Sequence, residues 1–159
     1  MQEDEEFRQL YCRHIELVYR ICLLYLKNTA DAEDAVQSVF LKVWEKSVCF
    51  RDENHEKAWL ITASRNYCRD VMKSSWKRKR AAWEEIEDME APETASKRNE
   101  VFTAVMELPA KYREVLYLYY YEGYSVKEMA AVLHRKESTL QTRLATARKR
   151  LKSLLEKEG

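Results

Sequence analysis

Glycine and proline are almost absent from this chain, since each occurs only twice among its 159 residues. A protein built from sheets needs many turns, and turns depend heavily on these two residues. Their scarcity therefore predicts long helices joined by few turns, which is an all-α fold. A chain of 159 residues has room for two small helical modules and little else.

The balance of apolar and charged residues excludes two classes of protein. Apolar residues make up 46% of the chain and charged residues 35%. The apolar share is too high for a disordered chain, and the charge is too high for a membrane protein. No apolar run approaches the roughly 20 residues that span a bilayer, and the acidic start MQEDEEF lacks the apolar core of a secretory signal. We therefore expect a cytoplasmic protein without membrane insertion.

The cysteines form no metal or redox motif. Cys12, Cys22, Cys49 and Cys68 include no Cys-x-x-Cys pair, so zinc and redox roles lack support. We expect reduced thiols that pack as small apolar groups, and the sequence predicts neither a cofactor nor a metal.

Charge is arranged in blocks that the net value of +1 conceals. Residues 57–82 carry eight basic groups and one acidic group, and residues 108–159 carry 11 and 6. The segments before them, 1–56 and 83–107, have net charges of −5 and −6. Two separate basic blocks predict two contacts with a polyanion.

Helical spacing of apolar residues predicts three helices in the first half of the chain. We expect them at Glu3–Leu26, at Asp31 to about Glu45, and at about Lys57–Arg80, with a polar loop at 48–56 before the third. The expected buried faces are Ala32, Ala35, Val36, Val39, Phe40, Val43 and Trp44 on the second helix, and Leu60, Ala63, Tyr67 and Val71 on the third.

The second half of the chain predicts another helical module. The acidic stretch 84–98 is expected to link residues 1–83 to residues 99–159. Helical spacing resumes after Ser96, and Pro109 is suited to the first turn of a helix that ends at Gly123. For the tyrosine-rich stretch that ends this helix, we expect packing in the core or at an interface rather than a stacking platform.

The last 50 residues have the pattern of a helix-turn-helix. A capping box at Ser125–Glu128 starts a short helix that ends at Leu133, and a longer basic helix covers about 137–156. In such a motif the second helix enters the major groove with short polar residues near its start, where Gln can address adenine and Arg can address guanine. The expected core of this motif is Val126, Met129, Leu133, Leu140 and Leu144. The expected DNA contacts are Ser138, Thr139, Gln141, Thr142 and Arg143 for bases, and Arg148 and Lys149 for phosphates. An ordinary amphipathic hairpin with a solvated basic face also fits this pattern.

The expected third helix combines cations with an aromatic ring. Its basic residues Arg65, Arg69, Lys73, Lys77 and Arg80 recur every three or four positions, with Trp59, Thr62 and Asn66 nearer the start. Rings that stack on bases and cations that meet phosphates suit a single nucleic-acid strand. The alternative is a buried Trp59 on a helix with a solvated cationic face.

The outer face of the second helix is a candidate docking surface. Asp34, Gln37 and Leu41 lie at i, i+3 and i+7 and point away from the expected buried face. An exposed leucine flanked by polar groups suits a partner helix, although a solvated face also fits.

Three segments in order resemble the extracytoplasmic-function (ECF) class of bacterial sigma factors. They are DAEDAVQSVFLKVWEK, AWLITASRNYCRD and LPAKYREVLYLYYYEGYSVKEMAAVL, and the resemblance extends from Phe7 to Leu155. It implies that residues 1–83 are a promoter-melting module like sigma region 2, and that residues 99–159 are a −35 module like region 4. It further implies a protein that directs the RNA polymerase core to specific promoters.

The resemblance also assigns roles to residues by position. Asp34, Gln37 and Leu41 would contact the clamp of the β′ subunit, and the β flap is the second expected contact on the polymerase core. The final helix would read the −35 element, and an anti-sigma factor is an expected second protein partner. The residues expected at the −10 element are Phe50, Arg51, Trp59, Thr62, Asn66, Arg69 and Lys73.

The helix-turn-helix departs from the family pattern at four positions. Glycines are usual where this chain has His134 and Ser138, a small capping residue is usual at Lys136, and a basic residue is usual at Gln141. Histidine adopts a left-handed conformation less easily than glycine, and lysine cannot cap a helix start. These departures concern the −35 preference rather than the fold.

Two other classes of function compete with this interpretation. A stand-alone helix-turn-helix regulator would bind duplex DNA unaided, but it would leave the basic stripe of residues 57–80 and the Asp34 face without a task. An enzyme would have only His14, His55 and His134 as near-neutral bases, with no phosphate loop, metal spacing or nucleophile elbow nearby. We therefore expect a protein that is not an enzyme.

Overall fold

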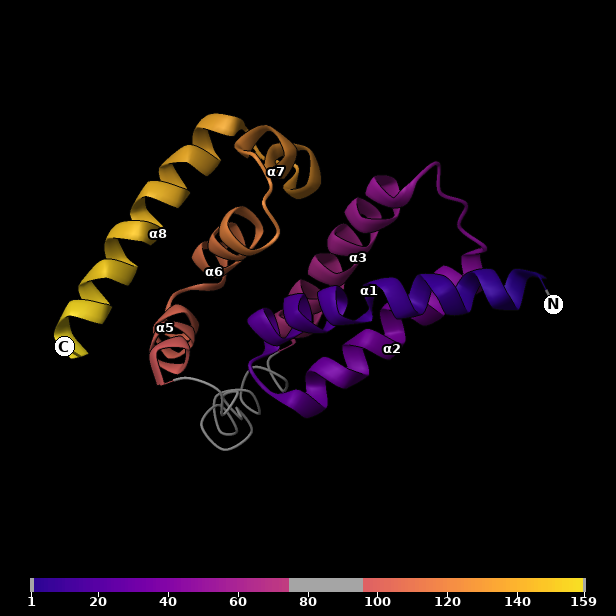
Figure 1. Ribbon diagram of the computed structural model, residues 1–159, viewed down its shortest axis with the longest axis horizontal. Helices are drawn as coiled ribbons and strands as arrows, with labels where there is room; N and C mark the ends of the chain where they lie inside the picture. Colours follow the sequence, from indigo (N-terminus) through magenta and orange to yellow (C-terminus); the bar gives the residue numbers. More distant parts are fainter. Residues whose placement is uncertain (1, 75–95, 159) are drawn as a thin grey trace. The chain divides into compact units, whose positions relative to one another are not determined.

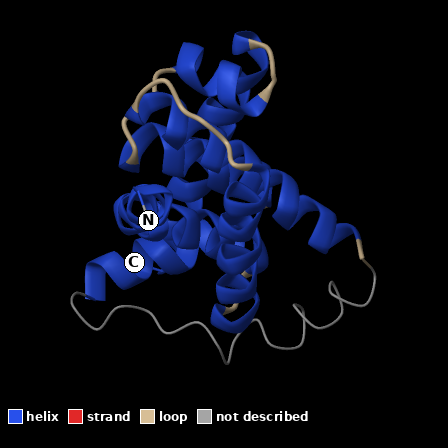
Figure 2. Cartoon of the chain, turned by 90° about the vertical axis from the view of Figure 1, so that its right-hand side faces the viewer, coloured by secondary structure: helices blue, strands red, loops and turns tan. Residues whose placement is uncertain are grey.

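The structure, a computed structural model, describes residues 2–74 and 96–158, and within these residues it contains helices and loops without strands (Figures 1 and 2). The chain divides into two compact units, Met1–Met89 and Glu90–Gly159. The all-α prediction is confirmed. The expected linker lies outside the described residues, except for residues 96–98, which are helical. None of the described helices is both long and apolar enough to cross a membrane.

The first unit is a bundle of three helices (Figure 1). Helix α1 (Gln2–Leu26) packs against both α2 (Thr29–Lys46) and α3 (Glu53–Lys73), and α2 also packs against α3. Each helix contributes side chains that are completely buried in the shared core, and these include Val18, Cys22, Ala32, Ala35, Leu60 and Cys68. The first two helices lie close to their expected bounds.

A buried polar pair makes the tight turn between α1 and α2. Asn28 has an extended backbone and caps α2, because its side-chain oxygen accepts the Asp31 N–H at 2.7 Å. Its amide donates to the Asp31 carboxylate at 2.8 Å and to the Leu26 carbonyl at 3.3 Å. Asp31 is thereby committed to the turn, whereas Asp34 of the same DAED segment is exposed.

The prediction of a polar loop over 48–56 was wrong in its second half. Helix α3 begins at Glu53, because the Asp52 side chain accepts the His55 N–H at 2.8 Å and caps the helix. Glu53 and Glu56 lie in the first turn, where their negative charges interact favourably with the positive end of the helix dipole. The helix ends at Lys73, and residues 75–80, including Lys77 and Arg80 of the expected stripe, lie outside the described residues.

The predicted faces of α2 and α3 need two corrections. Trp44 was expected in the core, but 46% of its surface is exposed. Arg65 was expected on the exposed stripe, but it is only 6% exposed. The core side of α3 consists of Leu60, Ile61, Ser64, Arg65 and Cys68, whereas Ala63, Tyr67 and Val71 are half-buried.

The cysteines follow the expectation in part. All four are free, and Cys22 and Cys68 are buried, whereas Cys12 and Cys49 are exposed and do not pack as core groups. Contact with the Cys22 thiol, together with burial, raises the pKa of Cys68. Because the thiolate is the reactive form, the raised pKa makes the Cys68 thiol unreactive.

The second unit is built around its last helix. Helix α8 (Glu137–Glu158) packs against α5 (Ser96–Glu107), α6 (Ala110–Leu116) and α7 (Val126–Leu133). Pro109 precedes α6 as its cap, one residue before the first-turn position that we expected. The helix does not continue as an α-helix to Gly123, because residues Tyr117–Tyr121 form the π-helical turn η1.

A buried arginine joins α5 to α6. The Arg113 guanidinium donates to the backbone oxygens of Leu108, at 2.7 Å, and Met106, at 3.3 Å. These carbonyls lie at the end of α5, where a helix leaves acceptors without partners of its own. Arg113 therefore fixes the corner that positions the rest of the unit.

Candidate surfaces for polymerase and promoter DNA

The outer face of α2 presents the expected docking residues together. Asp34, Gln37 and Leu41 are all exposed, and Leu41 is 54% exposed, which is unusual for a leucine in a packed bundle. Their spacing places them on one side of the helix, opposite the buried stripe. This side of α2 combines a carboxylate, an amide and an apolar side chain in one row.

Trp44 extends this row by one turn, and the sequence analysis missed it. It lies three positions after Leu41, and its ring meets Phe7 of α1 edge to face at 5.1 Å. The Phe7 ring fixes one side of the indole and leaves the rest accessible. The signal was present, because positions 34, 37, 41 and 44 share one helical face.

An aromatic cluster forms where the α2–α3 loop enters α3. The Phe50 ring meets the His55 ring at 5.3 Å and the Trp59 ring at 5.8 Å, both edge to face. The backbone N–H of the neighbouring Arg51 donates to His55 Nδ1 at 3.1 Å. The structure thus brings Phe50 and Trp59 together as expected, and it places the His55 ring against Phe50.

The remaining candidate residues of the first unit follow along one face of α3. Trp59, Thr62, Asn66, Arg69 and Lys73 are separated by three or four positions, and each is exposed or half-buried. This face therefore carries a ring, a hydroxyl, an amide and two cations in succession. That composition suits bases and phosphates of a single strand.

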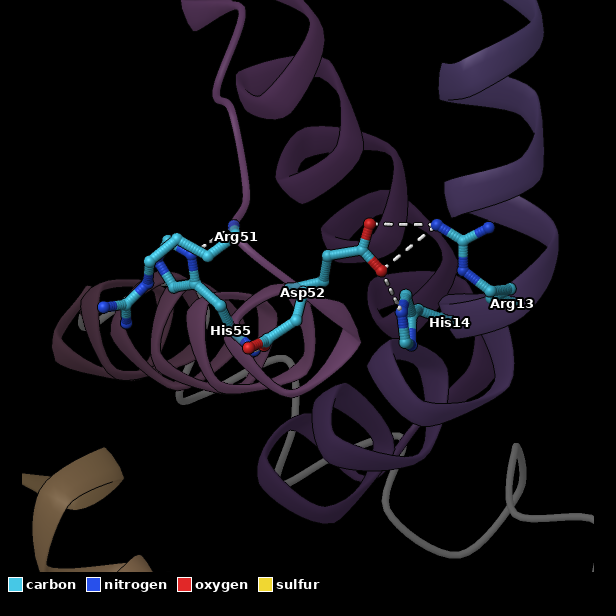
Figure 3. Close-up of polar contacts among 6 residues, drawn as sticks. Arg13, His14, Arg51, Asp52 and His55 are labelled. Carbon is cyan, nitrogen blue, oxygen red and sulfur yellow. Dashed lines mark hydrogen bonds and ion pairs between the residues drawn. The ribbon is translucent and has the colours of Figure 1, made fainter.

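An ion-pair cluster fixes the start of α3 to α1 (Figure 3). The Arg13 guanidinium donates to both carboxylate oxygens of Glu56, at 3.1 and 2.9 Å. His14 Nε2 lies 3.2 Å from the same carboxylate, and His14 is buried. Glu56 follows His55 directly in the chain. These ion pairs therefore restrain the first turn of α3, which carries the His55 ring of the aromatic cluster.

The second unit ends in the expected helix-turn-helix. The capping box at the start of α7 is complete, since the Glu128 N–H donates to Ser125 Oγ at 3.1 Å and the Ser125 N–H donates to Glu128 Oε1 at 3.0 Å. His134 ends α7 in the left-handed conformation, with φ of 55°, in place of the usual glycine. Four of the five expected core residues, Met129, Leu133, Leu140 and Leu144, are buried, and Val126 is half-buried.

The first turns of α8 present the expected reading residues. Ser138, Gln141 and Thr142 are exposed, whereas Thr139 and Arg143 are half-buried. The Thr142 hydroxyl donates to the Ser138 carbonyl at 3.0 Å, so its hydrogen is already used within the helix. Ser138, Thr142 and Lys149 lie on the most exposed side of α8, and Arg143 lies on a flank.

A buried carboxyl group lies behind Arg143. Glu114 of α6 is 5% exposed, and burial raises its pKa to about 8. The guanidinium groups of Arg143 and Arg135 oppose part of this shift through their positive charge. Arg143 is thus electrostatically coupled to the core of the unit.

Arg148 is held by two tyrosines of η1, Tyr119 and Tyr120. Its guanidinium donates to the Tyr120 hydroxyl and lies 5.3 and 5.5 Å from the centroids of the Tyr119 and Tyr120 rings. Tyr120 and Tyr121 are 60% and 59% exposed, so these two do not pack in the core, and their packing at an interface stays a prediction. Their contacts are with charged and aromatic neighbours at the surface.

Each of the two units matches a known protein family. The family described as Sigma-70 region 2 matches residues 10–78, and Sigma-70, region 4 matches residues 98–151. The ECF RNA polymerase sigma factor SigM of Mycobacterium tuberculosis is 30% identical over 151 residues, which covers 94% of this chain and 76% of SigM. SigM of Bacillus subtilis is 30% identical over 152 residues, covering 92% of this chain and 93% of that protein.

Solved structures show the same fold. The sigma factor RpoE of Bartonella quintana, crystallised with the anti-sigma factor NepR, has a TM-score of 0.77 and 25% identity, and covers 96% of this chain and 98% of that one. CnrH, solved with the cytosolic domain of CnrY, has a TM-score of 0.68 and 24% identity, and covers 98% and 91%.

Two helical units, of which the second ends in a helix-turn-helix, define a two-region transcription initiation factor. The chain belongs to the ECF RNA polymerase sigma factors. A sigma factor directs RNA polymerase to promoters and is not an enzyme, in agreement with the sequence prediction.

Proposed function

We propose that this sigma factor captures the −10 element with its first unit and reads the −35 element with α8. The observation that carries the proposal is the Phe50–Trp59 ring pair, which continues into Thr62, Asn66, Arg69 and Lys73 on one face of α3. A base that leaves the duplex stacks on rings, and the strand that follows it meets an amide and two cations. Arg51, exposed beside the cluster, adds a third cation.

The second contact is duplex readout in the major groove. Ser138, Thr139, Gln141, Thr142 and Arg143 occupy the first turns of α8, which is the part of a recognition helix that meets base edges. Gln141 is suited to adenine and Arg143 to guanine. Lys149 and Arg148, further along the helix, meet phosphates, and the Tyr119 and Tyr120 rings orient Arg148.

Both units also contact the polymerase core. Asp34, Gln37 and Leu41 form the contact with the β′ clamp, which the exposure of Leu41 supports. In the second unit, Leu116, Leu151 and Leu155 line a shallow apolar groove that suits the β flap. A protein with this function acts in the cytoplasm, because the polymerase and the chromosome are there.

An anti-sigma factor is the second proposed partner. The sigma factor RpoE, which shares this fold and 25% of its residues, was crystallised with the anti-sigma factor NepR. A protein that covers the exposed α2 face would compete directly with the polymerase core for Leu41.

The test is run-off transcription with purified bacterial core polymerase and a pool of randomised promoter fragments. We expect transcripts that depend on the protein and that weaken in the Asp34→Ala/Gln37→Ala double variant. Arg143→Ala should lower the yield roughly 5- to 100-fold, the value of one bidentate base contact. Glu16→Ala is the control for the docking row, because it removes an exposed carboxylate from α1 and leaves α2 unchanged. Lys157→Ala, in the last turn of α8, is the control for Arg143.

The opposite result is equally informative. If no transcript depends on the protein while the free protein protects a specific duplex from cleavage, the division of roles between the two units proposed here is wrong.

A further inference from the structure

His55 contacts two residues that precede α3, Arg51 and Phe50, and both lie before the capping residue Asp52. Its Nδ1 accepts the Arg51 N–H at 3.1 Å, and its ring meets the Phe50 ring at 5.3 Å with the planes at 82°. Its own N–H donates to the Asp52 side chain at 2.8 Å. One imidazole therefore restrains both residues that lead into the helix.

This arrangement differs from an ordinary capping box, which the same chain has at α7. There the Glu128 side chain returns to the N–H of the capping residue itself, Ser125. At α3 the side chain in the equivalent third position reaches one residue further, to Arg51. The bond consequently orders the loop outside the helix, where regular helical bonds cannot reach. A ring nitrogen that accepts this hydrogen bond carries no hydrogen of its own, so the bond uses the Nδ1 lone pair.

The ordered loop determines where the Phe50 ring stands relative to Trp59. The two rings are 5.8 Å apart, and a base that joins them requires both to keep their positions. Rings that are free to move can repack around an incorrect base as well as around the correct one, which lowers the difference in binding free energy between them. Fixed rings leave selection to the fit of the base.

We propose that His55 is a positioning residue for −10 capture, which holds the Phe50 ring and the Arg51 backbone in place before a flipped base of single-stranded DNA arrives. The role rests on the proposed function, since it has meaning only if the Phe50–Trp59 cluster receives a base. Glu56, the next residue, supports the arrangement through its ion pairs with Arg13 and His14 on α1. The restraint on the loop is thus continuous with the core of the unit.

Two substitutions separate the acceptor from the ring. His55→Phe keeps a ring that can meet Phe50 and removes the acceptor. His55→Asn keeps an acceptor, because the asparagine Oδ1 stands where Nδ1 stands in histidine, and removes most of the ring. The holoenzyme first selects a promoter from a randomised pool. The assay then compares transcription from that promoter with transcription from single-base variants of its −10 element. This ratio cancels differences in protein concentration and in affinity for the core.

We expect His55→Phe to lower the −10 selectivity about fivefold, the effect of one hydrogen bond, and His55→Asn to keep it within about twofold. Both variants should have the thermal unfolding midpoint of the wild type. Unchanged selectivity in His55→Phe, or equal losses in both variants, would overturn the proposal. A wild-type holoenzyme that selects no promoter would instead refute the proposed function, so the two failures are distinguishable.

Discussion

Glu114 makes the stability of the second unit depend on pH in a direction opposite to most carboxyl groups. An exposed glutamate is ionised at neutral pH, but burial raises the pKa of Glu114 from 4.5 to about 8. The positive charges of Arg143 and Arg135 oppose the shift without cancelling it. The folded unit therefore favours the protonated acid, whereas the unfolded chain ionises it at ordinary pH.

The sign and size of the effect follow from linkage. A carboxyl group whose folded pKa is raised contributes its full stability below the unfolded pKa of 4.5, and that stability is lost as pH rises toward 8. Each pH unit inside this window changes the free energy of unfolding by about 1.4 kcal/mol, so the whole window has a ceiling of about 5 kcal/mol. Glu114→Gln removes the titration and keeps the shape of the side chain. We expect the Gln variant to gain at least about 2 kcal/mol over the wild type between pH 5 and pH 8.

Urea denaturation at several pH values measures this difference. Residues 90–159 contain no tryptophan, and the described Trp44 and Trp59 belong to the first unit, so tryptophan fluorescence does not report directly on the second unit and serves as an internal reference. Helical circular dichroism follows both units, and its remaining transition belongs to the second. Glu107→Gln is the matched control, because it makes the same chemical change at an exposed position of α5.

The reasoning would be refuted by parallel stability curves for the wild type and Glu114→Gln. It would also be refuted by a Gln variant that is less stable at every pH, because the carboxylate would then be a net stabilising partner of Arg143 and Arg135. If Glu107→Gln gives the same increase in the free energy of unfolding, the increase comes from a general change of charge rather than from the burial of Glu114.

Three further substitutions give independent tests. His134→Gly should stabilise the second unit by about 0.5–1 kcal/mol in urea denaturation, because glycine adopts the observed φ of 55° without a Cβ penalty. Ser125→Ala should destabilise that unit by about 1 kcal/mol in the same assay, since it removes half of the capping box. Leu41→Asp should leave stability within about 0.5 kcal/mol, because the side chain is exposed, but weaken binding to core polymerase about tenfold or more in a competition assay. A Leu41→Asp variant that binds core normally would remove Leu41 from the docking face.

Sequence periodicity predicted the parts of the fold in which one helical face is apolar and continuous. The buried stripe of α2 and the helix-turn-helix core have this pattern, and both were confirmed apart from Trp44 and the half-buried Val126. The start of α3 has no apolar residue between Asp52 and Lys57, so periodicity gave no signal there. A capping argument from Asp52 and the acidic first turn would have found it.

The sequence predicted which candidate residues share a helical face. It did not predict the contacts that their side chains make. Spacing alone placed Trp59, Thr62, Asn66, Arg69 and Lys73 on one side of a helix. Charge periodicity, however, does not reveal which side faces the core, so Arg65 was assigned to the stripe although it is buried. The bond from Arg51 to His55 Nδ1 depends on the loop backbone, which no residue pattern in this stretch specifies.

The proposed contacts predict that promoter recognition by this chain depends on the polymerase core. In the proposed assignment, α8 presents three cations to duplex DNA, Arg143, Arg148 and Lys149, and Tyr120 already holds one of them. With three such contacts, the logarithm of the binding constant falls with the logarithm of the salt concentration with a slope of only about −3. A tight stand-alone DNA-binding protein has a much steeper slope. In the same proposed assignment, the rings of the first unit bind a base that is accessible only once the duplex opens. When core polymerase binds both units, the contact with one promoter element makes the contact with the other an intramolecular step. The equilibrium constants of the two weak contacts then multiply. Loss of Arg143 and disturbance of the Phe50–Trp59 pair should therefore combine multiplicatively in transcription while leaving the affinity for core unchanged.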